Sequence, residues 1–290
     1  MARRIRLTVA YDGTDYHGWQ IQNNQITIEG KLNESISDLL SVPTQVIGAS
    51  RTDAGVHAMG NIAVFDCESP IPAEKFAGAI NARLPENIRV MKSDEVDPDW
   101  HPRKQDCKKT YEYRISIGKV QLPTRRLYSH FTYHALNVSA MKRACEGFIG
   151  EHDFSAFCAA GSQAESMVRT VYSVEVLEEN VVSYVNRDFK NEDDKIEGTS
   201  NKNSPKSDTK SDTKSDTYIT DGEIVIRVTG NGFLYNMVRI IAGTLMDVGC
   251  EKKHPEDIPD VINSKDRRCA GPTLPAKGLT LLHYEYDCET

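Results

Sequence analysis

The most constraining feature of the sequence is alternation of apolar and polar residues in several segments that are spaced irregularly among helical patterns. In Arg4–Tyr11 every second side chain from Ile5 onward is apolar or aromatic, which is typical of a half-buried strand. Thr110–Ile117 repeats the pattern in the second half of the chain. Strands and helices follow one another without the regular βαβα order of a doubly wound parallel sheet. We therefore expect an α+β fold with antiparallel or mixed strand pairing.

Apolar spacing predicts the remaining elements. Strands are expected over 46–49, 61–66, 88–96, 170–177, 223–228 and 279–286. Helices are expected over 28–40, 73–84, 141–149 and 235–248.

The length of 290 residues suits two domains or one large one. Pro98 and Pro102 mark the end of a first half, so we expect an N-terminal α+β half over 1–105 and a C-terminal α+β half over 106–290. A stretch poor in apolar residues contains Lys-Ser-Asp-Thr three times in tandem, starting at Lys206. Such a composition cannot bury enough surface to offset its ordering entropy. We expect a disordered insertion at about 186–221.

Several features bear on the compartment. No apolar run approaches the roughly 18 residues that a membrane helix needs. The basic start leads into an alternating segment rather than an apolar stretch with a cleavage site, so no secretory signal is expected. Seven scattered cysteines suit reduced thiols better than a disulfide framework. We therefore expect a cytoplasmic protein that does not contact membranes.

The net charge of −7 argues at first against a nucleic-acid partner. The charge is unevenly distributed, however. Glu178–Glu223 holds twelve acidic and seven basic residues, whereas His101–Arg126 holds eight basic and two acidic residues. A second basic cluster lies at Arg3, Arg4 and Arg6. Two local surfaces are thus basic enough to approach phosphates.

Several common catalytic motifs are missing from the sequence. Gly230-Asn-Gly-Phe-Leu-Tyr235 lacks the third glycine of a dinucleotide fingerprint, and there is no P-loop. The histidines and cysteines do not follow metal-site spacing, and no GxSxG motif occurs. We expect neither a nucleotide cofactor nor a metal, and chemistry that depends on ordinary side chains.

A dense polar cluster, Ser50-Arg-Thr-Asp-Ala-Gly-Val-His57, lies between two expected strands. It allows two interpretations. Asp53 could cap a hairpin turn in which Gly55 supplies a positive φ. Alternatively, an arginine holds Asp53 ionised in a closed pocket, as a reactive carboxylate requires.

Four ordered motifs resemble those of the tRNA pseudouridine synthase A family. They are Ala10–Gln20, Arg51-Thr-Asp-Ala-Gly-Val-His57, Gly232-Phe-Leu-Tyr-Asn-Met-Val-Arg239 and Ala276-Lys-Gly-Leu279. The chain departs from the family at Ser50, where a glycine is common, and in the Lys-Ser-Asp-Thr insertion. The resemblance implies the pseudouridine synthase fold, in which two pseudo-symmetric halves join their sheets across a central active-site cleft.

The resemblance also implies a function: isomerisation of uridine to pseudouridine in tRNA, at positions 38 to 40 of the anticodon stem-loop, by a homodimer without a cofactor. Asp53 matches the catalytic carboxylate and Arg239 its partner. Arg51 matches an arginine associated with the flipped-out base. Tyr111 matches a tyrosine that stacks on the base, although Tyr111 and Tyr113 could equally be aromatic residues packed on one strand face.

Two other functions remain open. Strand aromatics flanked by lysines, as in Lys108–Tyr113, also occur in RNA-binding proteins without catalytic activity. A nucleosidase or glycosidase would use the same carboxylate but hydrolyse the bond, and the sequence offers no clear second acid for it.

Overall fold

The computed structural model describes residues 2–185 and 216–286. Strands within these ranges are β1 (Arg3–Tyr11), β2 (Ile47–Gly48), β3 (His57–Cys67), β4 (Ile88–Val96), β5 (Cys107–Ile117), β6 (His130–Thr132), β7 (Leu136–Asn137), β8 (Gly150–Asp153), β9 (Val168–Val185), β10 (Thr217–Gly230) and β11 (Leu279–Tyr286). The α-helices are α1 (Ile28–Leu40), α2 (Phe76–Asn81), α3 (Val138–Cys145), α4 (Met237–Gly249) and α5 (Ile258–Ser264).

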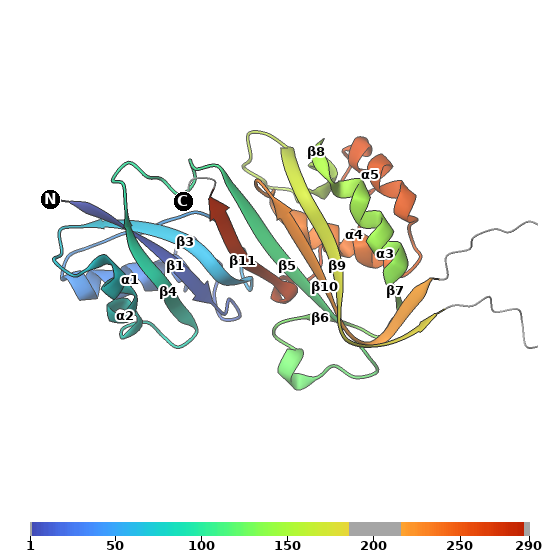
Figure 1. Cartoon of the computed structure of the whole chain (residues 1–290), viewed down its shortest axis with the longest axis horizontal. Helices are drawn as coiled ribbons and strands as arrows, with labels where there is room; N and C mark the ends of the chain where they lie inside the picture. The colour runs from blue at the N-terminus through green and yellow to red at the C-terminus, as the bar shows by residue number, and fades with distance from the viewer. Residues whose placement is uncertain (1, 186–215, 287–290) are drawn as a thin grey trace, which may run out of the picture.

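One continuous sheet runs through the described molecule in the order β4-β1-β3-β11-β5-β10-β9-β8, with β2, β6 and β7 beside it (Figure 1). Most neighbours are antiparallel, whereas β11 is parallel to β3 and β6 is parallel to β5. The expected α+β fold with mixed pairing is confirmed.

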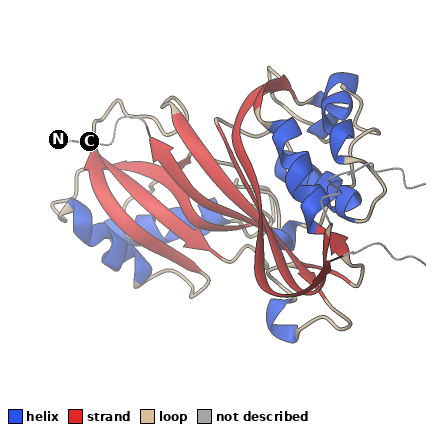
Figure 2. Ribbon diagram, turned by 45° about the vertical axis from the view of Figure 1, so that its right-hand side comes forward, coloured by secondary structure: helices blue, strands red, loops and turns tan. Residues whose placement is uncertain are grey.

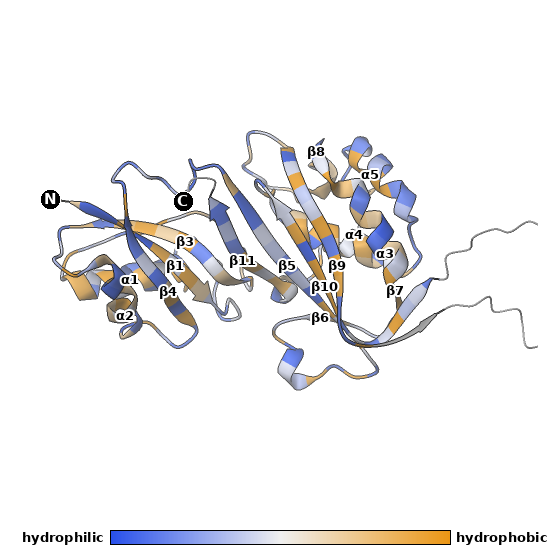
Figure 3. Ribbon diagram, in the orientation of Figure 1, coloured by the Kyte–Doolittle hydropathy of each residue, from blue (hydrophilic) through white to orange (hydrophobic). Residues whose placement is uncertain are grey.

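The helices form two groups on this sheet (Figure 2). α1 and α2 pack on the part that contains β1, β3 and β4, and α3, α4 and α5 gather beside β9 and β10. Apolar residues concentrate where helices meet strands, as the hydropathy colouring of α4 shows (Figure 3). In β1 the alternation predicted from the sequence is present, because Ile5, Leu7, Val9 and Tyr11 are all buried.

The joint between the two parts is β11, although it comes last along the described chain. Its residues Thr280 and Leu281 pair with His57 and Ala58 of β3 on one side. On its other side, Leu281 pairs with Tyr111 of β5. β11 therefore sets the register between the start of β3 and the middle of β5.

Helix α1 has the predicted bounds. It begins after Thr27, whose hydroxyl accepts a hydrogen bond from the Gly30 N–H at 3.2 Å. The helix expected over 141–149 starts earlier, at Val138, because the Asn137 side chain caps the Ala140 N–H at 2.9 Å.

The sequence prediction was wrong at the end of the expected insertion. Residues 217–221 belong to β10, which begins six residues before the expected start at Glu223. The last two residues of the repeat are held by residues of the α3 region: Asp216 forms an ion pair with Arg143 at 2.9 Å, and the Thr217 N–H donates to Ser139 Oγ. The remainder of the expected insertion, 186–215, lies outside the described residues, and so does most of the Lys-Ser-Asp-Thr repeat.

Two further observations bear on the sequence predictions. The six cysteines in 2–185 and 216–286 are all free thiols, and Cys288 lies beyond these ranges. No helix in the same ranges is both long and apolar enough to cross a bilayer.

Candidate active site

The polar cluster forms a tight turn that leads into β3. The Val56 N–H donates to the Asp53 carbonyl at 3.1 Å, and Gly55 has a φ of 78°. The turn predicted from the Asp-x-Gly pattern is therefore present, but backbone groups close it. The Asp53 carboxylate accepts no hydrogen bond from any described residue, so turn formation does not account for an acid at this position.

Behind the turn lies the loop that follows β1. The Trp19 N–H donates to the Thr52 carbonyl at 3.0 Å. Gly18 has a φ of 89°, and a Cβ there would lie 2.6 Å from the same carbonyl oxygen. Only glycine permits this close approach without strain. The loop thereby fixes the backbone beside Asp53.

Arg239 lies in the first turn of α4 and faces Asp53. Its Nη1 is 3.7 Å from Asp53 Oδ2, which is close enough for attraction but too long for a hydrogen bond. Both side chains are largely buried, with 16% of Arg239 and 32% of Asp53 exposed. Arg239 Nε donates to the Leu274 carbonyl at 2.7 Å and Nη1 to Asn236 Oδ1 at 2.6 Å. The guanidinium is thus held in place independently of the carboxylate.

Burial raises the pKa of Asp53 above its ordinary value of 3.8, and the charge of Arg239 opposes that rise. The sequence analysis anticipated both influences, and here desolvation is the larger. A carboxylate in this environment is a better base and nucleophile than a solvated one, because it lacks stabilising hydrogen bonds.

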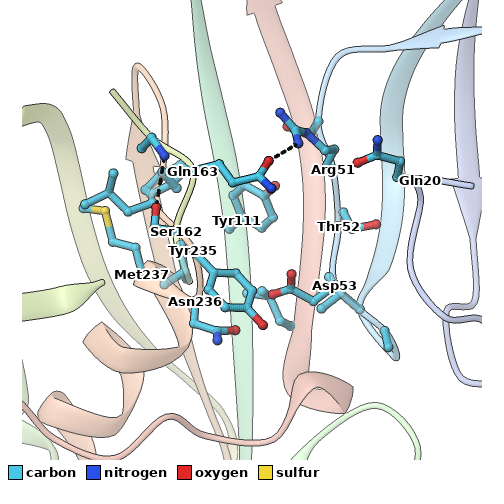
Figure 4. Close-up of a pocket in the computed structure, with 18 of the residues that line it drawn as sticks. Gln20, Arg51, Thr52, Asp53, Tyr111, Ser162, Gln163, Tyr235, Asn236 and Met237 are labelled. Atoms are coloured by element: carbon cyan, nitrogen blue, oxygen red, sulfur yellow. Dashed lines mark hydrogen bonds between the residues drawn. The ribbon is translucent and has the colours of Figure 1, made fainter. Parts of the chain in front are cut away.

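A cavity of about 690 Å³ opens in front of Asp53, within the usual size range of small-molecule sites. Its lining comes from both parts of the sheet: His17, Gln20, Gln22, Ala49–Ala54, Val56, Lys109, Tyr111, Gly161–Ala164, Arg169, Phe233–Val238 and Leu279. Figure 4 shows Asp53 facing Tyr235 and Asn236 across this space. The expected central cleft is therefore present.

Tyr111 and Tyr113 lie two residues apart on β5 but have different surroundings. Tyr111 lines the cavity, and its ring meets Phe233 edge-on at a centroid distance of 5.2 Å. Burial raises the pKa of Tyr111 to about 12, and the charge of Asp53 acts in the same direction. Tyr113 is fully buried, and its hydroxyl donates to the Pro275 carbonyl at 2.8 Å. Tyr113, which the sequence left undecided, is a packing residue.

Arg51 lies at the rim of the cavity and is exposed. Its Nη1 donates to Gln163 Oε1 at 3.4 Å, which links the Ser50–His57 cluster to the loop before β9 (Figure 4). The structure thus places Arg51, Asp53 and Tyr111 on one cavity, with Arg239 directly behind Asp53.

The 161–164 loop and Arg169, which no sequence motif indicated, line the cavity from the second part of the sheet. Neither follows a catalytic motif, and only a proximity established by the fold reveals them. His57, which was left out of the catalytic set, does not line the cavity. Its Nδ1 lies 3.1 Å from Asp12 Oδ1 and accepts the Gly13 N–H, and its Nε2 is 3.1 Å from the Leu127 carbonyl.

Comparison with known proteins identifies the family. A family model described as tRNA pseudouridine synthase matches residues 7–103 and 144–287. Proteins named tRNA pseudouridine synthase A from Ruminiclostridium cellulolyticum and Caldicellulosiruptor bescii are 42% and 40% identical to the chain. Each alignment covers 98% of this chain and 100% of the relative. The chain belongs to the tRNA pseudouridine synthase family. The resemblance indicated by four short motifs is confirmed.

The family model covers some of the candidate site residues but not all of them. Asp53, Arg51 and Arg239 fall within the residues matched by the family model, whereas Tyr111 falls in the gap between its two segments. Ser50, the departure from the tRNA pseudouridine synthase pattern noted above, accepts a hydrogen bond from the Tyr284 hydroxyl of β11. This serine therefore ties the Ser50–His57 cluster to the central strand β11.

Proposed function

We propose that the chain isomerises uridine to pseudouridine in the anticodon stem-loop of tRNA, at positions 38 to 40, with Asp53 as the catalytic residue. One observation carries the assignment. Asp53 is a largely buried carboxylate that lines a nucleoside-sized cavity, accepts no hydrogen bond within the described residues, and lies 3.7 Å from a guanidinium that other groups hold in place.

The reaction requires a group that assists departure of the base and its return through another atom. The C1′–N1 bond breaks, the base turns, and a C1′–C5 bond forms while C5 loses a proton and N1 gains one. The change is redox neutral. Asp53 either attacks a carbon covalently or stabilises positive charge at the ribose, as in glycosidases. Arg239 keeps Asp53 ionised against the effect of burial.

A uridine stacked in RNA must leave the stack to reach Asp53, at a cost of a few kcal/mol. We propose that Arg51 contacts the flipped-out base, because its exposed guanidinium lies at the cavity rim. Tyr111 offers the base an aromatic ring on the cavity wall, and with a pKa of about 12 its hydroxyl is neutral at physiological pH. The proposed substrate-binding residues are Arg51 and Tyr111, which line the cavity, and Arg239, which acts through its charge on Asp53.

The remaining expectations form part of the same proposal. The halves 1–105 and 106–290 are pseudo-symmetric units that share the site, and the protein acts as a cytoplasmic homodimer with tRNA as its partner. Two exposed cations are suitably placed for an RNA ligand: Arg51 lines the cavity, and Arg103 donates to the carbonyl of Gly48, next to the cavity-lining Ala49.

Release of tritium from tRNA labelled at C5 of uridine tests the function, because isomerisation replaces that hydrogen whereas RNA binding and hydrolysis leave it in place. We expect release by the wild type and none above background by Asp53→Asn. RNA binding without release would favour a binding protein, and appearance of free uracil would favour a hydrolase. Undiminished release by Asp53→Asn would refute the assignment of the catalytic residue.

A further inference from the structure

A second, smaller cavity of about 340 Å³ adjoins the one that contains Asp53. It is lined by Lys109, Val168, Arg169 and Asn231–Phe233. Lys109, Arg169 and Phe233 line both cavities, so the two spaces meet at these side chains.

Lys109 and Arg169 are cations for which the described part of the chain offers no acidic partner. Both side chains are partly buried, and neither has a carboxylate within 4 Å among residues 2–185 and 216–286. The Lys109 ammonium makes a cation–π contact, 5.4 Å from the centre of the Tyr284 ring. Most other basic residues of comparable burial in β1 and β5 form ion pairs, for example Arg114 with Glu223 at 2.7 Å. An anion bound between these two cations would offset their desolvation and the repulsion that Arg169 exerts on Lys109.

The charge of Arg169 also acts on the pKa of Lys109. Burial lowers the pKa of Lys109, and the charges of Arg169 and Arg103 lower it further. Burial also lowers the pKa of Arg169. A bound anion would reverse these effects, so binding of an anion and full protonation of Lys109 favour each other.

The backbone holds Arg169 in position. Asn231 pairs reciprocally with Thr170: its N–H donates to the Thr170 carbonyl at 3.0 Å, and its Oδ1 accepts the Thr170 N–H at 3.0 Å. Gly230 permits this contact, because a Cβ there would lie 2.9 Å from the Thr170 carbonyl oxygen. Arg169 uses Nη1 for its hydrogen bonds to the carbonyls of Ser166 and Val168. No residue in 2–185 or 216–286 accepts a hydrogen bond from its Nε or Nη2, so these donors can serve a ligand.

We propose that Lys109 and Arg169 form a subsite for a backbone phosphate of the RNA, next to the nucleotide that enters the main cavity. The inference rests on the proposed function, since it takes RNA as the ligand. Arginine donors and a lysine point charge are the usual protein partners of phosphate. Because this anchor lies beside the Asp53 cavity, it would hold the strand while the uridine is extruded.

The test measures binding of a tRNA transcript in the Asp53→Asn background, so that turnover does not interfere. We expect Lys109→Met and Arg169→Gln each to raise Kd by about tenfold, the usual effect of losing one charge-assisted contact. The slope of log Kd against log salt should also decrease in magnitude by about 0.7 for each variant. Lys108→Met is the matched control: Lys108 precedes Lys109 on β5, lines neither cavity and lies 5.5 Å from the Tyr172 ring centre.

A second arm locates the phosphate. Single methylphosphonates, which are neutral, are placed in turn at the phosphates flanking the target uridine of a stem-loop RNA. One of them should weaken binding to the Asp53→Asn protein about tenfold and have no further effect when Lys109 and Arg169 are also replaced.

Unchanged Kd and salt slope in the Lys109 and Arg169 variants, or an equal loss in Lys108→Met, would overturn the subsite. The subsite would also be overturned if every methylphosphonate weakened binding to the protein with both Lys109 and Arg169 replaced as much as it weakens binding to the Asp53→Asn protein. Lys109→Arg, which keeps the charge, should bind within about threefold of its parent and so separates a phosphate contact from a folding defect. Absence of tritium release by the wild type would refute the proposed function instead, and the binding comparison would still stand.

Discussion

Arg239 approaches Asp53 to 3.7 Å without forming a hydrogen bond to it, while its Nε and Nη1 bind the Leu274 carbonyl and Asn236 Oδ1. The guanidinium is therefore positioned by Asn236, at the start of α4, and by the Leu274 carbonyl, without any contribution from a substrate. Its influence on Asp53 is electrostatic, and the carboxylate remains free to react.

Arg239→Gln removes the charge that opposes the rise in the Asp53 pKa. Because Asp53 must be ionised to react, the acidic limb of the kcat/KM profile should move to higher pH. At neutral pH, kcat/KM should fall by at least about tenfold, the usual cost of losing a charged partner. Rates measured across pH check this, with exposed Arg268→Gln as control. A lower rate with an unmoved limb would contradict the role assigned to Arg239.

Asp53 should also leave a signature in stability. Its pKa is raised in the folded protein, so the folded state holds the proton more tightly than the unfolded state does. Stability is therefore lost as pH rises from the ordinary value of 3.8 through the raised pKa. Relative to wild type, Asp53→Asn should gain stability on going from acid to pH 7. Urea unfolding at several pH values measures the difference, and exposed Asp260→Asn should show no such trend.

The two β5 tyrosines provide a matched pair. We propose that the Tyr111 hydroxyl assists proton transfer, in addition to the stacking of its ring on the base. Tyr111→Phe keeps the ring on the cavity wall but loses the hydroxyl, so we expect kcat to fall by about a hundredfold. Tyr113→Phe loses its bond to the Pro275 carbonyl and should lower the free energy of unfolding by about 1 kcal/mol with kcat nearly unchanged. The reverse pattern would show that the cavity-facing and buried roles have been exchanged.

Gly278 should not tolerate a side chain. A Cβ there would lie 2.6 Å from Cζ of the buried Tyr113 ring, just before β11 begins. Gly278→Ala should destabilise the protein by about 1–3 kcal/mol, as overpacking usually does. Gly78→Ala is the control, because a Cβ at that position would meet no atom within 4 Å and alanine favours helix α2 by about 0.5–1 kcal/mol. Equal melting temperatures for the two variants would contradict this argument.

Elements that bury one clear face were predictable. Periodicity placed β1, α1 and β11 within a residue of their bounds, since each presents a regular apolar stripe to the core. The short strands β6, β7 and β8 escaped prediction because two to four residues are too few to show a period. The start of β10 was missed because its first residues are polar and border a repeat.

In the candidate site, too, some residues were predictable from the sequence and others were not. Arg51 and Asp53 were identifiable because they share one short motif, and Arg239 because it lies in another. Their convergence on one cavity depends on β11, whose pairing with β3 and β5 no local pattern indicates. Gln163 and Arg169 were invisible for the same reason: their contacts with the site are long-range and follow from how the two parts of the sheet are joined.

The place of β11 in the sheet also governs when the site can exist during synthesis. Arg51, Tyr111 and Arg239 have all been translated before Leu279, yet β3 and β5 acquire their common register only when β11 lies between them. A nascent chain that has reached α5 can therefore have both groups of helices and still lack an assembled cavity. Because β11 carries the pairing that brings Asp53 and Tyr111 together, we expect a chain that ends before β11 to be inactive.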